Sequence, residues 1–261
     1  MPVTITNISR TSFHDGPGIR TVVYFNGCKM RCEWCHNPET ISRDNEILYV
    51  KDKCIHCGRC LFCENHITDG DDMVFKRQDC KKCGKCAINC PSGALTVCGK
   101  EYSPESLFKE IEKDRLYFEE SGGGVTLSGG ECLLQPAFCQ KFLKLCKENG
   151  IDTLIETALF VPWENIEALV PYTDRFYCDL KLANSASHKK YTGVDNRIII
   201  ENLKKLSLIH KDITVRIPLI PKVNDSVEDM VDFAKIINTL GEISGIELLA
   251  YNYLAKGLYF S

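Results

Sequence analysis

The sequence predicts an α/β fold in which strands and helices alternate along most of the chain. Six short runs rich in β-branched and apolar residues are separated by stretches with helical spacing, and eleven of the sixteen cysteines are concentrated between Cys28 and Cys90. Alternating strands and helices place parallel strands side by side in one sheet. We therefore predict a partial (β/α)6 barrel of the TIM type, interrupted by a cysteine-rich insert.

The predicted strands and helices follow one another in the order that such a barrel requires. The strands cover residues 21–27, 124–130, 152–157, 175–181, 213–220 and 245–251. The helices cover residues 103–120, 136–148, 196–210 and 226–240. Ser103 is a suitable N-cap, with Pro104 at the first helical position. Functional groups of such barrels lie at the carboxyl ends of strands, so the loop after strand 21–27 is expected on the functional face.

Composition and charge exclude several classes of protein. The length of 261 residues suits one large domain, or one domain with an insert. A net charge of −3 gives no electrostatic reason to expect nucleic acid as a partner. The first residues contain no apolar core of a signal peptide, and no window approaches 18 uninterrupted apolar residues. We therefore expect a cytoplasmic protein without a membrane segment.

The cysteines favour metal binding over disulfides, because disulfide frameworks belong to small secreted domains. Two dense runs consist of Cys54, Cys57, Cys60 and Cys63, and of Cys80, Cys83, Cys86 and Cys90. The second run has the spacing C-x2-C-x2-C-x3-C-P, the bacterial ferredoxin signature for a cubane iron–sulfur cluster. Gly58 and Gly84 occupy matching places in the two runs, where a loop that folds over sulfur has little room for a side chain.

The first run differs from the ferredoxin pattern, because it closes with two intervening residues and lacks the proline. In two-cluster ferredoxins the fourth cysteine of one run binds the other cluster. Cys63 is therefore the expected fourth ligand of the second cluster, with His66 and Cys98 as alternatives. Zinc is an alternative metal, but two dense quartets of this spacing favour iron–sulfur clusters. We predict a ferredoxin-like domain with two 4Fe-4S clusters at residues 50–100, and a barrel built from residues 1–49 and 101–261.

The loop after strand 21–27 contains three further cysteines, Cys28, Cys32 and Cys35, spaced C-x3-C-x2-C. A cubane cluster has four irons, so three cysteines leave one iron open for a substrate or cofactor. The alternative is a zinc ion that takes His36 as its fourth ligand.

This spacing after a first barrel strand resembles the radical S-adenosylmethionine (SAM) enzymes. Together with "DGPGIR" and "CHNPE", it resembles the glycyl-radical-enzyme activating enzymes over nearly the whole chain. The resemblance implies a third 4Fe-4S cluster that binds SAM at its open iron and cleaves it reductively to a 5′-deoxyadenosyl radical. That radical would take a hydrogen atom from a glycine Cα of a partner enzyme. The resemblance also implies a monomer that receives electrons from flavodoxin or ferredoxin.

The resemblance assigns roles to residues at matching positions. The residues expected to bind SAM are Trp34, His36, Ser128, Gly129, Gly130, Glu131, Glu156, Thr157, Asp179, Lys181, Arg216 and Asn252. The residues expected to meet the partner enzyme are Asp15, Gly16, Pro17, Gly18 and Arg20. Glu156 stands where the family has an aspartate of a monovalent cation site, so the presence of that cation is left open. Asn252 stands where the family has a histidine. Relatives usually continue through another helix, so either the chain is truncated or its barrel ends more open.

Two other functions fit parts of this pattern. One is a radical SAM enzyme that acts on a small molecule, and the other is a ferredoxin-like electron carrier without catalysis. The "DGPGIR" segment and the length disfavour the first, and the barrel with its three-cysteine loop disfavours the second. The remaining cysteines are expected to be core residues: Cys98, Cys132, Cys139, Cys146 and Cys178.

Overall fold

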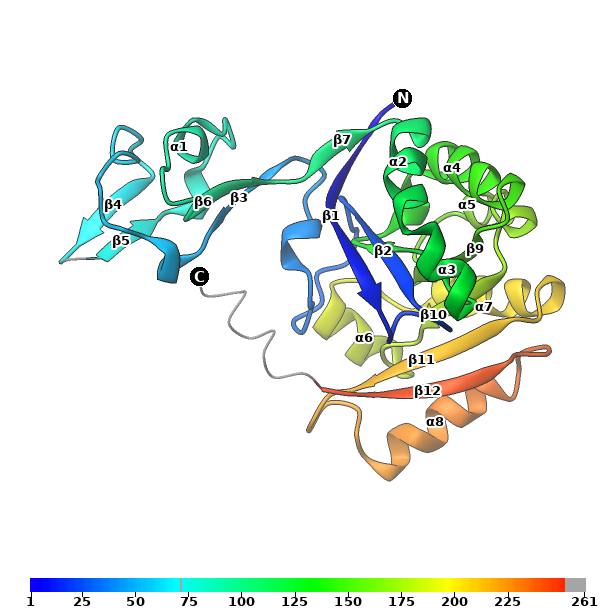
Figure 1. Cartoon of the computed structure of the whole chain (residues 1–261). Coiled ribbons are helices and arrows are strands. Elements are labelled where there is room, and N and C mark those ends of the chain that lie inside the picture. Colours follow the sequence, from blue (N-terminus) through cyan, green and yellow to red (C-terminus); the bar gives the residue numbers. More distant parts are fainter. Residues whose placement is uncertain (71, 252–261) are drawn as a thin grey trace.

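The computed structural model describes residues 1–70 and 72–251, and an eight-stranded sheet forms its larger part (Figure 1). The strands are β1 (Val3–Ser12), β2 (Arg20–Phe25), β7 (Lys100–Tyr102), β8 (Gly124–Gly129), β9 (Asp152–Thr157), β10 (Arg175–Asp179), β11 (Ile213–Leu219) and β12 (Gly245–Ala250). Their order is β12-β11-β10-β9-β8-β2-β1-β7, with two ends that do not pair with each other. The sheet is therefore an open, partial barrel.

The six predicted strands are all present, and they pair in parallel from β2 to β12. Sequence analysis missed β1 and β7, which extend the sheet beyond β2 through antiparallel pairing. β7 is the edge strand and β1 lies beside it, and the polar residues of both strands hide the alternation that marks a half-buried strand. A parallel sheet brings the carboxyl ends of β2 and β8–β12 together, which places the loops that follow them around one space.

The helices of the barrel connect these strands. They are α2 (Pro104–Ile111), α3 (Arg115–Ser121), α4 (Pro136–Glu148), α5 (Trp163–Glu167), α6 (Ser185–Thr192), α7 (Arg197–Ile209) and α8 (Val227–Ile237). The helix predicted from Ser103 to Glu120 is interrupted by a 3-10 turn, because the buried Asp114 turns inward and accepts a hydrogen bond from Thr21 at 2.8 Å. Ser103 does cap α2, in a reciprocal pair of hydrogen bonds with Ser106.

The cysteine-rich segment forms a separate lobe beside the sheet, to the left in Figure 1. It contains β3 (Glu46–Tyr49), β4 (His66–Asp69), β5 (Asp72–Phe75), α1 (Lys85–Ile88) and β6 (Leu95–Cys98). β3 pairs with β6 and β4 pairs with β5, in two small antiparallel sheets. The core of this lobe consists of six buried residues: Ile47, Tyr49, Met73, Cys86, Ala94 and Leu95.

The barrel has a much larger core, which runs from β1 to α8 and includes Phe25, Leu127, Phe142 and Phe176. Four of the five cysteines predicted to be core residues belong to this cluster, and the fifth, Cys98, is also buried. Among the described residues, no helix has the length and apolar character needed to cross a membrane.

Candidate active site

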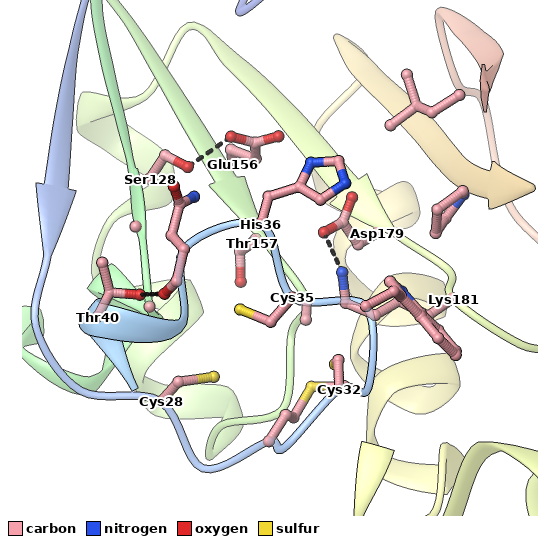
Figure 2. A pocket seen from close by; sticks show the side chains of 18 of the residues that line it. Cys28, Cys32, Cys35, His36, Thr40, Ser128, Glu156, Thr157, Asp179 and Lys181 are labelled. Carbon is pink, nitrogen blue, oxygen red and sulfur yellow. Dashed lines mark hydrogen bonds and ion pairs between the residues drawn. The ribbon is translucent and has the colours of Figure 1, made fainter. Parts of the chain in front are cut away.

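The three-cysteine loop runs from the end of β2 to a 3-10 turn at Pro38–Thr40, and it closes one side of a cavity of about 200 Å³. Cys28, Cys32 and Cys35 all line this cavity. The other walls come from the carboxyl ends of strands β8 to β12 or the residues just after them. Figure 2 shows the three cysteine side chains facing the strand ends that carry Glu156 and Asp179.

The cysteines are arranged around the cavity rather than toward one point. In the part of the chain that the structure describes, no three His, Cys, Asp or Glu side chains converge closely enough to hold a single metal ion. Burial raises the pKa of the Cys28 thiol to about 11 and that of Cys32 to about 12. Such thiols stay neutral at neutral pH unless a metal centre binds their thiolates. This donor set fits a cluster of several irons better than a zinc ion with His36.

The glycine-rich turn after β8 lies directly against the base of the cysteine loop. The Gly130 N–H donates to the Phe25 carbonyl at 2.8 Å, and the Glu131 N–H donates to the Gly27 carbonyl at 2.8 Å. Gly129 has a φ of 104°, and a Cβ on either Gly129 or Gly130 would collide with the backbone near β2. These two glycines therefore allow β8 and the cysteine loop to meet, and both also line the cavity.

Two pairs of opposite charges lie in or beside the cavity. Glu156 Oε1 accepts a hydrogen bond from Arg216 Nη1 at 2.6 Å, and Glu156 Oε2 accepts from Ser128 Oγ at 2.5 Å. Lys181 Nζ donates to Asp179 Oδ2 at 2.7 Å. Burial alone would lower the pKa of Lys181, but Asp179 and the nearby Cys32 outweigh it and raise that pKa. Lys181 is therefore a cation beside the three cysteines of the loop.

The structure brings most of the predicted SAM-binding residues to this cavity. Those that line it are Trp34, His36, Ser128, Gly129, Gly130, Glu156, Thr157, Asp179 and Lys181. Arg216 lies behind Glu156, where it also bonds Glu247 at 2.8 Å, so it reaches the cavity only through Glu156. Asn252 falls outside the described residues. Lining residues that sequence reasoning missed are Asn37, which belongs to the "CHNPE" motif, and residues for which no motif offers a signal, including Thr40, Pro218, Ile220 and Leu249.

Glu131 does not line the cavity with its side chain, and its predicted contact with SAM stays a prediction. Its carboxylate points away from the cavity and is buried, where it accepts hydrogen bonds from Thr157 Oγ1 at 2.9 Å, Ala158 N–H at 3.1 Å and Leu133 N–H at 3.2 Å. Burial raises its pKa to about 7 despite these donors. Glu131 thus joins the ends of β8 and β9, and it supports the cavity wall rather than forming it.

Arg20 is a correction to the predicted partner surface, because its side chain is not exposed on that surface. Its side chain is fully buried and pairs with Asp152 at 2.8 Å, and it donates to Thr126 Oγ1 at 2.8 Å. A Cβ on Gly16 would collide with the Arg20 side chain, so the preceding segment packs directly on it. Asp15 is half-buried and accepts a hydrogen bond from Ser12, whereas Pro17 is exposed. Arg20 therefore anchors the "DGPGIR" segment.

The cysteines of the insert form two mixed groups. Cys54, Cys57 and Cys60 of the first run line one cavity of about 250 Å³ together with Cys90, the last cysteine of the second run. Burial raises the pKa of the Cys86 thiol, and the neighbouring Cys80 and Cys63 raise it further, so Cys63 lies with the second run. Each run therefore lends its fourth cysteine to the neighbourhood of the other.

The two alternatives to Cys63 lie elsewhere. His66 is buried and stacks on Phe75 with 4.8 Å between ring centres. Cys98 is buried at the end of β6 that pairs with Glu46, and its sulfur faces the Thr6 carbonyl of β1. The position of Cys98 favours a packing role, whereas both ring nitrogens of His66 are buried without a hydrogen-bond partner among the described residues, so His66 stays an alternative ligand.

Comparisons with known proteins give the same picture as the fold and the site. Residues 22–234 match the radical SAM superfamily. The radical SAM methyltransferase of Sphaerobacter thermophilus superimposes with a TM-score of 0.53 and 13% identity, covering 94% of this chain and 67% of that one, a likeness of fold alone. The chain therefore belongs to the radical SAM superfamily.

Proteins with similar sequences show to which group within the radical SAM superfamily the chain belongs. The (2S)-3-sulfopropanediol dehydratase activating enzyme of Klebsiella oxytoca is 42% identical, covering 99% of this chain and 84% of that protein. The trans-4-hydroxy-L-proline dehydratase activating enzyme of Clostridioides difficile is 40% identical, covering 98% of this chain and 86% of that protein. Within the superfamily, the chain belongs to the activating enzymes of glycyl radical enzymes.

Proposed function

We propose that this protein activates a partner enzyme by removing one hydrogen atom from a glycine Cα of that partner. The observation that carries the proposal is the incomplete ligand set of Cys28, Cys32 and Cys35 in a cavity lined by charged residues. Cys28, Cys32 and Cys35 would hold three irons of a cubane cluster, and its fourth iron would then be free to bind SAM. Bound there, the cluster supplies the electron that splits SAM into methionine and a 5′-deoxyadenosyl radical.

The residues of the chain then have distinct tasks. Cys28, Cys32 and Cys35 would hold three irons. Lys181 would offer its ammonium group to the carboxylate of SAM, and the backbone of Gly129 and Gly130 leaves room for the amino acid part of SAM. Hydrogen abstraction depends mainly on placing the reacting atoms close together. The apolar side chains of Ile220 and Leu249, which also line the cavity, would keep water away from the radical.

The contacts of Glu156 and Asp179 support a site without a monovalent cation. Both oxygens of Glu156 already accept hydrogen bonds, from Arg216 and Ser128, and Asp179 is paired with Lys181. Glutamate is one methylene longer than the family's aspartate, which lets Glu156 reach Arg216 on β11. We infer that the chain's own cations neutralise these carboxylates.

Residues 50–100 would form a ferredoxin-like domain that holds two further 4Fe-4S clusters. The grouping of Cys54, Cys57, Cys60 and Cys90 in one cavity supports the first of these, and the position of Cys63 beside Cys80 and Cys86 supports the second. The exchanged fourth cysteines are the feature expected of two-cluster ferredoxins.

The second group lies nearer the barrel than the first. Lys82, beside Cys83, bonds Glu46 at 2.5 Å and Ser42 at 2.9 Å, at the end of β3 that joins the cysteine loop. The first group lines a cavity with Tyr49 at the opposite end of β3. This order supports a path for electrons from a flavodoxin or ferredoxin, through the outer and then the inner cluster, to the cavity of the barrel.

The experiment that tests the proposed function mixes the anaerobically reconstituted protein with candidate glycyl radical enzymes, SAM and a reductant. We expect a glycyl radical signal in electron paramagnetic resonance (EPR) spectra of the correct partner. The amount of 5′-deoxyadenosine formed should equal the amount of glycyl radical. The relatives are named for dehydratases of 3-sulfopropanediol and hydroxyproline, so glycyl radical dehydratases are the first partners to test. Consumption of a small metabolite with SAM, and no radical on any such partner, would instead support a small-molecule enzyme.

A further inference from the structure

The loop that carries Cys28, Cys32 and Cys35 has no helix or strand of its own between β2 and Pro38, so bonds to other segments determine its shape. The Gly27 N–H donates to the Thr40 carbonyl at 2.7 Å, and the Cys28 N–H donates to the Ile41 carbonyl at 3.0 Å. These two bonds close the base of the loop. They leave the conformation around Cys32, at the far end of the loop, to be set by other contacts.

Helix α6 supplies those contacts. The Arg31 N–H donates to the Thr192 carbonyl at 2.8 Å, and the Glu33 N–H donates to the Tyr191 carbonyl at 3.0 Å. Arg31 and Glu33 flank Cys32, so the two bonds hold the backbone on both sides of this cysteine. Tyr191 and Thr192 are the last residues of α6, whose carbonyls have no N–H partner inside the helix. The end of α6 therefore acts as a pair of acceptors for the cysteine loop.

His188 determines the shape of this helix end. It is fully buried, and its Nδ1 lies 2.6 Å from the Val194 carbonyl and 3.0 Å from Thr192 Oγ1. A carbonyl oxygen can only accept, so Nδ1 carries the proton in this bond. Thr192 Oγ1 in turn donates to the His188 carbonyl at 2.7 Å. The imidazole thus bridges Gly193, whose φ of 82° ends the helix in the left-handed conformation.

Packing on the other side of α6 joins the same helix end to the cavity. Trp34, which precedes Cys35, is buried against Tyr191 with 6.0 Å between ring centres. The buried Asn196 donates to the carbonyls of Leu182 and Ala183 at 2.9 and 2.8 Å, which ties the segment after α6 to the segment that follows β10. A displacement of the end of α6 would therefore displace the cysteine loop as well.

We propose that His188 is a positioning residue for the cysteine loop: it fixes the end of α6, and the Tyr191 and Thr192 carbonyls then hold the backbone on both sides of Cys32. The inference rests on the proposed function, because it supposes that this loop holds a cluster. Removing a group that orients a metal ligand typically costs roughly 10- to 100-fold in metal affinity.

The test compares three substitutions that differ in where they offer an N–H group. His188→Asn places its amide nitrogen near the position of Nδ1, whereas His188→Gln places it near the position of Nε2. Nε2 is buried and has no hydrogen-bond partner among the described residues, so an N–H group there satisfies nothing. His188→Ala offers no donor. The matched control is His210→Ala, which removes an imidazole bonded to the Thr173 carbonyl at 3.1 Å, far from the loop along the barrel.

The measurement is the rate at which a chelator removes iron from the barrel cluster of the reconstituted full chain. This rate is monitored through the EPR signal that changes when SAM is added, because that signal belongs to the barrel cluster. We expect His188→Ala and His188→Gln to lose that iron roughly 10- to 100-fold faster than the wild type, with an altered spectrum. His188→Asn and His210→Ala should resemble the wild type. If His188→Ala does not fold, the difference in iron loss between His188→Asn and His188→Gln tests the proposal.

Two outcomes contradict the proposal in different ways. Equal iron retention and an unchanged spectrum in the Ala and Gln variants would show that His188 only fills space. Rescue by Gln but not by Asn would assign the role to Nε2 instead of Nδ1 and overturn the proposed geometry. Failure of the wild type to take up iron at Cys28, Cys32 and Cys35 would refute the proposed function itself, and this inference with it.

Discussion

The barrel and the insert both gather cysteines, but they do so by different means. In the barrel, one loop supplies Cys28, Cys32 and Cys35, and strand ends far apart in the sequence supply the rest of the cavity. In the insert, two runs with short regular spacing exchange their last cysteines. The barrel cavity is thus built by tertiary packing, whereas the insert sites are built mainly by local spacing.

The buried cores of the two regions differ in size. The buried core of the barrel includes residues from nearly all of its strands and helices, whereas that of the insert contains only six residues. A lobe with so little buried apolar surface usually needs a metal or other cross-link to stay folded. We therefore expect the barrel to stay folded without a cluster and the insert to unfold without its clusters.

The largest expected effect comes from removing a ligand of the barrel. Changing Cys28, Cys32 or Cys35 to Ala should abolish SAM cleavage, because no spare cysteine lies near in the loop to replace the lost ligand. The insert should keep its two clusters, since none of its cysteines belongs to this cavity. The measurement is 5′-deoxyadenosine formation together with iron content. Continued 5′-deoxyadenosine formation by such a variant would refute the assignment of the three cysteines.

Metal removal tests directly whether the insert depends on its clusters for folding and the barrel does not. Three cubane sites predict roughly twelve irons per chain after anaerobic reconstitution. Stripping the iron should unfold residues 50–100 while the barrel stays folded, because binding free energy of such metal sites is largely folding free energy. Hydrogen exchange of the two regions, with and without iron, is the measurement.

Two results would contradict this prediction. An iron content near four per chain, or zinc in place of iron, would exclude the two clusters of the insert. Equal protection of residues 50–100 with and without iron would show that six buried residues are enough to hold the lobe together.

A smaller effect is expected at the "DGPGIR" segment, where the barrel would meet its partner. Asp15→Ala should keep all clusters and SAM affinity but activate the partner about tenfold less, because a hydrogen bond to a charged group contributes about 1.5–3 kcal/mol. The glycyl radical signal and SAM affinity are measured side by side. Full activation by this variant would make Asp15 a turn residue that only accepts its bond from Ser12. An equal loss of SAM binding would place Asp15 in the cofactor site.

The smallest effect is expected at Glu156. With the chain's own cations beside Glu156 and Asp179, wild-type activity should not depend on potassium or sodium when these are replaced by a large organic cation. Glu156→Asp shortens the side chain away from Arg216 and should create a dependence of a few-fold, comparable to the loss of about 1 kcal/mol from one hydrogen bond. A strong dependence in the wild type would show that a monovalent cation does bind here.

Much of this protein could be predicted from the sequence because the relevant signals are local. Runs such as residues 152–157 have the composition of buried strands, and they appear as predicted. Ser103 caps its helix because capping involves only the next few residues. Cysteine spacing is also a local signal, because a short loop can wrap around a cluster without help from distant parts of the chain, and the three cluster sites that it indicates stay a prediction.

Other features were decided only by the tertiary structure, because they depend on which distant segments meet. Arg20 looked like a surface residue, but β8 and β9 bring Thr126 and Asp152 to its guanidinium and bury it. Glu131 belongs to a motif associated with SAM, yet Thr157 at the end of β9 turns its carboxylate away from the cavity. Arg216 lies 60 residues beyond Glu156 in the chain, and the Tyr191 and Thr192 carbonyls lie still farther from Glu33 and Arg31, which donate to them. A hydrogen bond across such a distance leaves no periodic signal in the sequence, so only the packed sheet determines which charges are neutralised and which backbone groups hold the cysteines.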